Sequence, residues 1–578
     1  MARSIGRSHA ARQSRYYLGA DSMSRDYDLI VVGGGWTGAV IATDACRNGL
    51  KTLVLEKGEI TSLIGTDIFY KSRSPGFPAK RLPDPVQETF TLRHERTGQS
   101  FPMRTLGTFL AGRGLGGAGL MWGGISARFH PHGFTSKTHY GDLLQQPWAE
   151  DLDYRDWPIG YDDLEPHYTW AEAVLGVAST RGLPSENYKR SHSLPGKPLD
   201  LSPKLAHLAK AASEIGLTVT ENPNALSLEP YTNPLGITRN VNPQHGYSLA
   251  TPLNTLWPAA VATGNLDLRS GHVHRVLHSG GRANGVTYTD EHGGRQTVLA
   301  PMVALCSWTL NNVRLLLLSR IGKAYSPDEG GLVGRHYANH IGVSSQGFLP
   351  EPIFEEPSSK IAGWANSDFD PGRDKTANYV GGTRIQVTGL YNLQRELPTV
   401  PDNAPQWGTG WQKALKQHVG RAVSVAMLGE VAPHKHRYLD IDTTYRDAWG
   451  DPLLRLNFDW QPNDRNMVSA VGTTLDNILK QAGADVSKTG TQLPEHYDTV
   501  HYTNSHATGG AIMGSDPASS VVDSNLQSWD VRGLWVVGAS AFPTSPAPNP
   551  TLTVIALAQR AAQSLVRQSA NLSSSVTA

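Results

Sequence analysis

His506 and Asn549 lie near the C-terminal end of this 578-residue chain, and their side-chain types suit the oxidation of an alcohol. That reaction removes a proton from oxygen while a hydride leaves carbon, and an imidazole that titrates near neutral pH is a natural base for the proton. A carboxamide beside it holds the hydroxyl oxygen without competing for the proton. The alternative is structural, with His506 as a core histidine and Asn549 as a helix cap. A second motif at the other end of the chain favours the chemical interpretation.

That second motif is a glycine turn of the type that binds dinucleotides. The apolar, strand-type run 28–32 leads into Gly33-Gly34-Gly35-Trp36-Thr37-Gly38, and a helix-type stretch follows. Gly33 allows the tight turn, Gly35 lets the backbone approach a pyrophosphate, and Gly38 lets helix and strand pack closely. The N-terminus of the helix offers free N–H groups and a positive dipole end to the phosphates. The order of strand, turn and helix predicts a dinucleotide site.

Two further segments fit such a site. A second strand-type run, 52–55, ends at Glu56, which is placed to accept hydrogen bonds from an adenosine ribose. The densest glycine cluster, 112–124, has many residues without a Cβ, so its backbone can wrap a flat ligand closely. A flexible surface loop is the alternative, but the apolar Leu120, Met121 and Trp122 favour burial. These motifs do not separate FAD from NAD.

Bulk properties exclude several classes of protein. The length favours two intimately joined domains. The formal net charge is +1 with no basic stripe, which argues against a nucleic-acid partner. Only Cys46 and Cys306 are present, and neither belongs to a CxxC pair, so we expect no metal site and no iron–sulfur cluster. No 18-residue apolar run occurs, and we expect no transmembrane segment.

The first twenty residues contain Arg and His but no acid, and they lack the apolar stretch of a secretion signal and a twin-arginine pair. We interpret them as part of a disordered arm, because Met23 lies just before the first strand and could be the natural start. A transit peptide is the alternative. The expected location is cytoplasmic as encoded, with partner-assisted export to the periplasm as the other interpretation.

The stretches His506-Ala507-Thr508-Gly509-Gly510-Ala511-Ile512-Met513-Gly514 and Asn549-Pro550-Thr551-Leu552-Thr553 resemble the signature end of the glucose–methanol–choline (GMC) flavin oxidoreductases. This resemblance favours FAD over NAD. Within the superfamily the chain is most similar to the large subunits of bacterial sugar and sugar-acid dehydrogenases (gluconate 2-dehydrogenase, fructose dehydrogenase, FAD glucose dehydrogenase). Its Asn-Pro-Thr-Leu-Thr ending also resembles pyranose 2-oxidase. The matching segments cover nearly the whole chain and include 34–39, 116–120, 331–335, 453–461, 526–531 and 537–543.

The resemblance implies an α/β fold in which a Rossmann-like FAD-binding domain carries an inserted α+β substrate domain on an antiparallel sheet. It implies FAD-dependent oxidation of a CH–OH group of a sugar or sugar derivative to the ketone or lactone. His506 would be the base, Asn549 would position the hydroxyl, and the hydride would pass to flavin N5. One alternative is a sugar oxidase that uses O₂ and releases H₂O₂. An alternative of another class is a non-catalytic flavoprotein subunit.

The expected cofactor contacts come from the two glycine motifs, one strand and the C-terminal motif. The final helix is predicted to have Asn549 as its N-cap and Pro550 at its first position. Its positive end would then point at the flavin pyrimidine ring. The expected FAD-binding residues are Gly33, Gly35, Trp36, Thr37, Gly38, Glu56, Gly116, Gly117, Met121, Gly123, Gly124, Val273, Gly538, Ala539, Pro550 and Thr551.

Two departures from the resemblance bear on cofactor and partners. Those dehydrogenase subunits commonly carry a cysteine cluster in a segment that here, at 240–248, has no Cys, so the usual electron route to a haem partner is missing. The electron acceptor would then be a quinone-like molecule, a dye or oxygen. The presence of a small partner subunit is left as an alternative. Some relatives bind flavin covalently through a His just before the Trp of the glycine cluster. Met121 precedes Trp122 here, so we expect non-covalent FAD.

The expected domain boundaries follow from these motifs and from a change to polar loops and alternating strands near residue 339. The FAD-binding domain takes 26–338 and 497–570, with substrate-side segments interspersed at about 130–264. The substrate-binding domain takes 339–496. A disordered N-terminal arm (1–25) and a disordered tail (571–578) complete the chain.

Overall fold

The computed structural model describes most of the chain. The described residues are 26–60, 64, 83–105, 109, 111–186, 188–243, 246–354, 362–388, 400–401, 403–499 and 505–576, with the backbone alone for 388 and 571–576. The expected arm at 1–25 lies outside them. Helix α13 (Thr551–Val576) includes residues 571–576 of the expected tail, and 577–578 lie outside the described residues.

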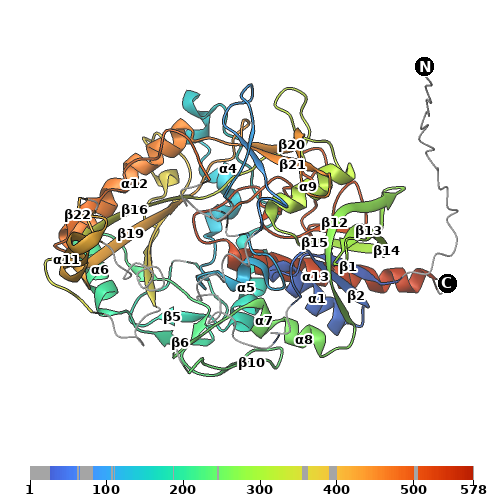
Figure 1. Ribbon diagram of the computed structural model, residues 1–578, viewed down its shortest axis with the longest axis horizontal. Helices are drawn as coiled ribbons and strands as arrows, with labels where there is room; N and C mark the ends of the chain where they lie inside the picture. The colour runs from blue at the N-terminus through green and yellow to red at the C-terminus, as the bar shows by residue number, and fades with distance from the viewer. Residues whose placement is uncertain are drawn as a thin grey trace, which may run out of the picture.

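A seven-stranded sheet forms the half of the molecule that contains the glycine turn (Figure 1). Its strand order is β14-β13-β12-β2-β1-β15-β23, in which β12 to β23 run parallel while β13 and β14 form an antiparallel extension. Helix α1 packs on β1 and β2, α13 packs on α1 and α5, and α9 packs on β12. The strands β1, β2, β15 and β23 are buried along their whole length, as strands of a parallel sheet covered by helices must be. The bounds are β1 (Leu29–Val32), α1 (Trp36–Arg47), β2 (Thr52–Glu56), α5 (Tyr161–Leu175), β12 (Leu266–Ser279), β13 (Arg282–Asp290), β14 (Arg295–Leu299), β15 (Met302–Leu305), α9 (Thr309–Ser319) and β23 (Leu534–Val536).

A six-stranded antiparallel sheet forms the other half, in the order β22-β16-β19-β18-β17-β7. Helix α12 lies along β16 and β19, and α6 packs on β17 and α12 (Figure 1). Five of the strands come from the expected substrate domain, and β7 comes from the expected substrate-side segment 130–264. The bounds are α6 (Pro203–Glu214), β7 (Thr220–Glu221), β16 (Ile341–Phe348), β17 (Gly363–Asn366), β18 (Thr383–Thr388), β19 (Ala422–Gly429), α12 (Pro462–Gln481) and β22 (Asp485–Lys488).

A smaller sheet joins the N-terminal part of the chain to the segment 339–496. Its order is β20-β21-β3-β4, with β20 (Tyr438–Arg446), β21 (Pro452–Asn457), β3 (Thr91–Arg93) and β4 (Phe101–Pro102). Strands β21 and β3 run parallel, and Arg93 Nε donates to Asn457 Oδ1 across the pair (2.7 Å). The expected substrate segment therefore contributes to two sheets, because β20 and β21 pair with β3 and β4 and pack beside α9.

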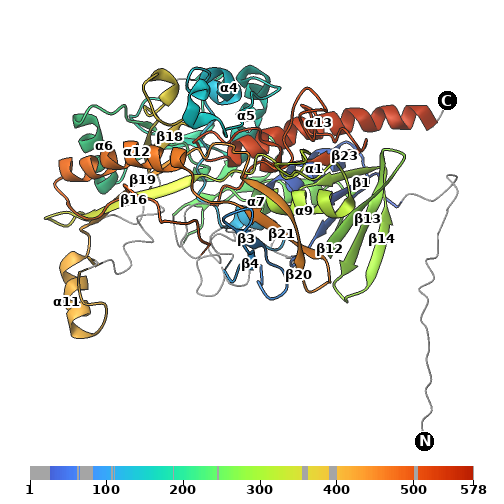
Figure 2. The ribbon, with the colours of Figure 1, turned by 90° about the horizontal axis from the view of Figure 1, so that it is seen from above.

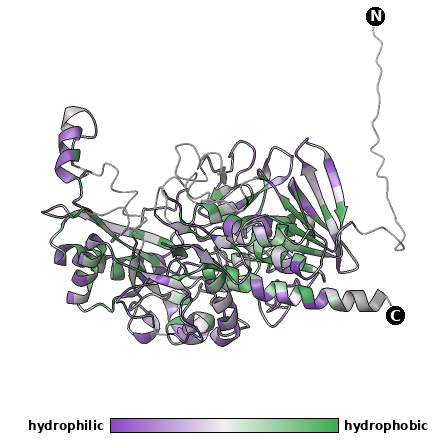
Figure 3. Cartoon of the chain, turned by 90° about the horizontal axis from the view of Figure 1, so that it is seen from below, coloured by the Kyte–Doolittle hydropathy of each residue, from purple (hydrophilic) through white to green (hydrophobic). Residues whose placement is uncertain are grey.

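The shorter elements lie between or outside the two large sheets. Helix α11 (Gly408–His418) protrudes from the body in Figure 2 and is mostly hydrophilic in Figure 3, whereas the hydrophobic segments gather in the interior strands. Within the described residues, no helix combines the length and the apolar character needed to cross a membrane. The other bounds are α4 (Ser136–His139), β5 (Ala178–Thr180), β6 (Gly196–Leu199), β8 (Leu226–Ser227), β9 (Tyr231–Thr232), β10 (Thr238–Arg239), β11 (Ser248–Leu249), α7 (Pro252–Thr255) and α8 (Trp257–Val261).

Candidate functional site

A long cavity opens at the carboxyl ends of the parallel strands and reaches both His506 and Asn549. Its walls include the residues that directly follow β1, β2, β15 and β23, and this edge is where open parallel sheets bind ligands. Fifteen sequence-predicted site residues line it: His506, Asn549, Gly33, Gly35, Trp36, Thr37, Glu56, Gly117, Met121, Gly123, Val273, Gly538, Ala539, Pro550 and Thr551. Sequence motifs more than 400 residues apart thus meet in one cavity.

The glycine turn has the geometry that its spacing predicts. Gly33 has φ +101°, which favours glycine, and a Cβ there would lie 2.6 Å from the carbonyl oxygen of Cys306. A Cβ on Gly38 would lie 2.0 Å from the carbonyl oxygen of Gly33, so only glycine lets α1 pack this close to the turn. A Cβ on Gly35 would meet nothing within 4 Å. The open space beside Gly35, at the N-terminus of α1, fits a pyrophosphate.

Three predicted contacts, Gly38, Gly116 and Gly124, do not line the cavity. Gly116 N–H donates to the Gly34 carbonyl (2.8 Å), and a Cβ on Gly116 would press on the side chain of Leu120. A Cβ on Gly124 would lie 2.4 Å from Asn224 Oδ1. These glycines allow close packing beside the cavity, as predicted for Gly38, and their contact with FAD stays a prediction.

Glu56 lines the cavity, but three backbone N–H groups already bind its carboxylate. Gly34 N–H donates to Oε2 (2.9 Å), while Gly58 and Gly114 N–H donate to Oε1 (2.9 and 3.0 Å). Glu56 therefore ties the first glycine turn to the second one. Its contact with a ribose stays a prediction.

Asn549 does not have the role of a helix cap. Helix α13 begins at Thr551, and the N–H of Val554 donates to the carbonyl of Pro550 (2.9 Å). The predicted start was therefore one residue too early. Asn549 Oδ1 is buried at the cavity wall without a hydrogen-bond partner among the described residues. A buried amide oxygen in this position is available to accept a hydrogen bond from a ligand in the cavity.

His506 is held on a segment that pairs with the residues just before β16. Thr508 and Ala338 form a two-way backbone bridge, and Thr309 Oγ1 donates to the carbonyl of Ala507 (2.7 Å). Burial lowers the pKa of His506 well below 6.5, and the neighbouring His340 lowers it further. The imidazole is therefore neutral near pH 7, which is the form that can accept a proton.

His340 contacts the predicted base His506, and no sequence motif predicted this contact. Its Nδ1 lies 3.0 Å from Nδ1 of His506, and its Nε2 lies 3.1 Å from the carbonyl oxygen of Ser545. Both His340 and Ser545 are completely buried. No local motif marks His340, because its contact with His506 exists only in the folded chain.

Three more cavity-lining side chains have buried polar atoms without a partner in the described part of the chain. They are Trp36 Nε1, His272 Nδ1 and Asn311 Oδ1. Burial lowers the pKa of His272 to about 4, so its ring is neutral and offers one donor and one acceptor. A cavity with unpaired donors and acceptors and an open glycine cradle fits a bound dinucleotide.

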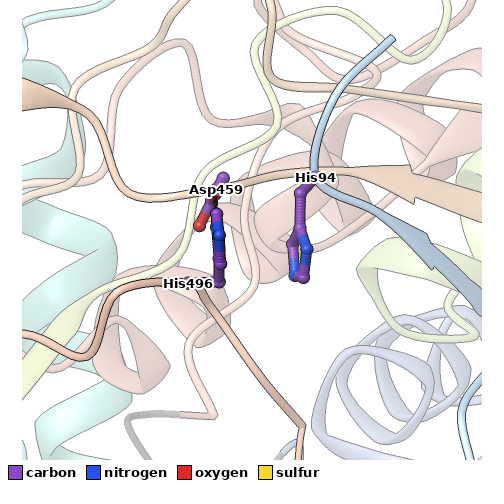
Figure 4. A group of neighbouring side chains, drawn as sticks. All are labelled: His94, Asp459 and His496. Atoms are coloured by element: carbon purple, nitrogen blue, oxygen red, sulfur yellow. Dashed lines mark hydrogen bonds and ion pairs between the residues drawn. The ribbon is translucent and has the colours of Figure 1, made fainter. Parts of the chain in front are cut away.

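Two groups of metal-ligand side chains lie outside this cavity, and Figure 4 shows His94, Asp459 and His496. The rings of His94 and His496 stack with centroids 4.9 Å apart and planes 15° apart, so their in-plane lone pairs do not converge. His496 Nδ1 instead lies 2.6 Å from Asp459 Oδ2. The second group is His132, His139 and Asp370, and its two histidines also stack, at 4.6 Å and 19°. Ring stacking and hydrogen bonds account for the arrangement of both groups. The expectation that the protein binds no metal stays a prediction.

Family models, sequence relatives and a solved structure relate this chain to known proteins. Family models described as GMC oxidoreductase match residues 27–342 and 433–558. The chain is 31% identical to the gluconate 2-dehydrogenase flavoprotein of Pantoea cypripedii, over 94% of each chain. It is 26% identical to the 2-methyl-1,2-propanediol dehydrogenase of Mycolicibacterium austroafricanum, over 94% of this chain and 95% of the relative. A crystal structure of pyridoxine 4-oxidase from "Mesorbium loti" superposes with a TM-score of 0.58 at 16% identity, over 93% of this chain and 98% of that one, and this match confirms the fold class.

Proposed function

The chain belongs to the GMC oxidoreductase family, whose members bind FAD, and we propose that it oxidises a CH–OH group of a sugar or sugar derivative to the ketone or lactone. One observation carries the proposal: His506 and the unpartnered amide of Asn549 line the same cavity as the glycine turn. The proposal thereby combines a base, a hydroxyl-binding group and a dinucleotide cradle in one site.

The residues that would hold FAD follow from the cavity walls. The open space at Gly35 and the first N–H groups of α1, at Trp36 and Thr37, would receive the pyrophosphate. The N-terminus of α13, with Pro550 and Thr551 in the wall, would face the ring end beside Asn549. When bound, FAD supplies the acceptor for the hydride. We propose that it is held without a covalent bond, because Met121 lines the cavity and its thioether cannot form a histidyl link.

The roles of the two catalytic candidates follow from their chemistry. His506 would accept the proton of the substrate hydroxyl, because burial keeps its ring neutral. The Nδ2–H group of Asn549 would donate to the hydroxyl oxygen and fix its orientation in the cavity. The apolar residues Ala507, Val537 and Val554 line the same cavity.

The substrate class and acceptor are proposed from the relatives and from the cysteine content. The name of the Pantoea relative specifies gluconate, a sugar acid, whereas that of the Mycolicibacterium relative specifies a small diol. We favour a sugar or sugar derivative on the higher identity to the former. With two cysteines in the whole chain, electrons would leave to a quinone-like or dye-like acceptor that reaches the cavity.

Anaerobic bleaching of the flavin tests the proposal. The purified holoenzyme would be mixed with D-gluconate, D-fructose or D-glucose, and with 2-methyl-1,2-propanediol as the non-sugar comparison. Bleaching by a sugar and slower bleaching by the diol would support the proposal. Bleaching by the diol alone would reject the sugar class. A flavin that dithionite reduces but no alcohol reduces would replace this function with that of a non-catalytic flavoprotein subunit.

A further inference from the structure

His340 is completely buried and lies between the backbone of Ser545 and His506, outside the cavity wall. Its two ring nitrogens have different neighbours. Nε2 lies 3.1 Å from the Ser545 carbonyl oxygen and 3.0 Å from Ser545 Oγ, while Nδ1 lies 3.0 Å from Nδ1 of His506. A row of hydrogen-bonding groups therefore runs from a backbone carbonyl through one imidazole to the next.

The hydrogen-bonding neighbours of each ring nitrogen determine which nitrogen of His340 holds the proton. A carbonyl oxygen accepts hydrogen bonds and cannot donate one, so a lone pair on Nε2 of His340 would repel it at this distance. Ser545 Oγ, 3.0 Å from the same nitrogen, can donate or accept and fits either tautomer. The carbonyl therefore decides, and we place the proton of His340 on Nε2, where it points at the Ser545 carbonyl. The Nδ1 atom of His340 then has the lone pair and acts as the acceptor.

Both rings are neutral near pH 7, so each holds one proton. Burial lowers the pKa of His340 to about 4, although the carbonyls of Ser545 and Pro546 oppose this effect. Burial also lowers the pKa of His506, and the neighbouring His340 lowers it further. Two neutral imidazoles with their Nδ1 atoms 3.0 Å apart need one donor and one acceptor between them.

We propose that His340 is a positioning residue that keeps the proton of His506 on Nδ1 and leaves the lone pair on Nε2 for the substrate hydroxyl. This inference rests on the proposed role of His506 as base. The Ser545 carbonyl sets the tautomer of His340, and His340 sets both the tautomer and the ring orientation of His506. His340 does not contact the substrate.

Ring ¹⁵N chemical shifts of the histidine-labelled holoenzyme test the tautomer without any substrate. Comparison with His506→Ala identifies the resonances of His506. We expect the wild-type protein to show a protonated Nδ1 and an unprotonated Nε2 on this ring, and His340→Leu to shift the population toward the opposite tautomer. The matched control is His434→Leu, which removes a buried histidine that does not line the cavity and should leave the His506 shifts unchanged. A wild-type His506 with its proton on Nε2 would overturn the proposal.

The rate of flavin reduction adds a second readout. His340→Leu should retain bound FAD but lower this rate about 10²-fold, the lower end of what a positioned base contributes. His340→Asn should recover most of the rate, because its Oδ1 can occupy the position of the Nδ1 acceptor. Equal loss in both variants, or no loss in His340→Leu, would contradict positioning through Nδ1. If His506→Ala itself reduced flavin normally, the base assignment would fail, and the measured tautomer would still decide the relation between the two histidines.

Discussion

Gly38 and Gly33 approach each other so closely that a Cβ on Gly38 would lie 2.0 Å from the carbonyl oxygen of Gly33. Gly35, between them in sequence, has the opposite environment, since a Cβ there would meet nothing within 4 Å. The same motif therefore contains one glycine required by the protein itself and another that leaves space for a ligand.

The first prediction uses this contrast. Gly38→Ala should lower the free energy of unfolding of the apoprotein by about 1–3 kcal/mol, because the methyl group overpacks the turn. Gly35→Ala should stay within about 1 kcal/mol of the wild type, the range for a changed N-cap, yet lose FAD affinity. Denaturant unfolding of the apoproteins and FAD titration check both variants. Tight FAD binding by Gly35→Ala would show that the pyrophosphate lies elsewhere.

The second prediction concerns the base. His506→Ala should keep the flavin spectrum but slow flavin reduction by at least about 10²-fold. The spectrum separates loss of chemistry from loss of cofactor. Near-normal reduction of this variant by a sugar that bleaches the wild type would contradict the assignment of His506.

The pH dependence follows from the pKa of His506, which burial lowers well below 6.5. The neutral ring is the active base, so kcat/KM should fall only when the pH drops through this lowered pKa. We therefore expect a plateau that continues below pH 6.5 on the acidic side. A pH series of flavin reduction checks this, and a decline centred at or above pH 6.5 would show that His506 is solvated or paired with an acid.

The third group of predictions concerns cofactor and electrons. Acid precipitation should leave the yellow FAD in the supernatant, because Met121 cannot form the histidyl link; colour in the pellet would reveal another linking residue.

The enzyme should also turn over with a two-electron dye without any cytochrome subunit, and iron analysis should find no iron. Reoxidation in air as fast as turnover with dye, with release of hydrogen peroxide, would establish the oxidase alternative.

The fourth prediction concerns the buried Arg128, which donates to both oxygens of Glu172 (2.9 and 2.7 Å) and to Glu165 (3.0 Å). Arg128→Met should cost about 3–5 kcal/mol, because it removes the buried cation that both carboxylates share, and in the described part of the chain only Glu172 keeps another cation nearby, at 3.4 Å from Arg190 Nε. The matched control is Arg181→Met, which removes an exposed pair with Asp200 and should cost less than about 1 kcal/mol. Equal losses in chemical denaturation would contradict this ranking.

Glu165, one of the two carboxylates paired with Arg128, gives a further prediction for the stability of the fold at acidic pH. Burial raises its pKa, but hydrogen bonds from Ser191 and Arg128 outweigh burial and lower the pKa from 4.5 to about 2. A lowered carboxylate pKa stabilises the fold at pH values above 4.5, and this contribution disappears as the pH falls from 4.5 toward 2. Glu165→Gln should therefore flatten the stability profile in that window. An unchanged slope would show that other carboxylates dominate acid unfolding.

The sequence predicted the parts of the site that depend on local spacing. Gly33, Gly35 and Gly38 follow from the order of strand, turn and helix, and the two ends of the chain meet as the motifs required. The final helix was predicted to begin one residue too early. A proline can occupy either the first helical position or the N-cap, and only the backbone hydrogen bonds of the folded chain show which position it has. Gly116 and Gly124, which were also predicted to contact the ligand, do not line the cavity, and composition alone does not show which glycines of a cluster face a cavity.

Contacts between segments that are distant in the sequence could not be predicted from local sequence patterns. The bond between His340 and His506 joins two of 21 histidines, and neither spacing nor neighbours distinguishes His340 from the rest. The parallel pairing of β21 with β3 was likewise not expected, because alternating strands do not specify their partners. Packing of whole elements determines both features.

The position of β23 in the parallel sheet has a consequence for protein synthesis. β23 pairs with β15, yet its residues follow those of β15 only after the entire antiparallel domain has been made. At about 5–20 residues per second, the ribosome needs roughly 10–50 s between Leu305 and Leu534. During that interval β15 is an open sheet edge on the nascent chain, of the kind that pairs with other chains. Translation speed and chaperone supply should therefore govern the soluble yield of this protein.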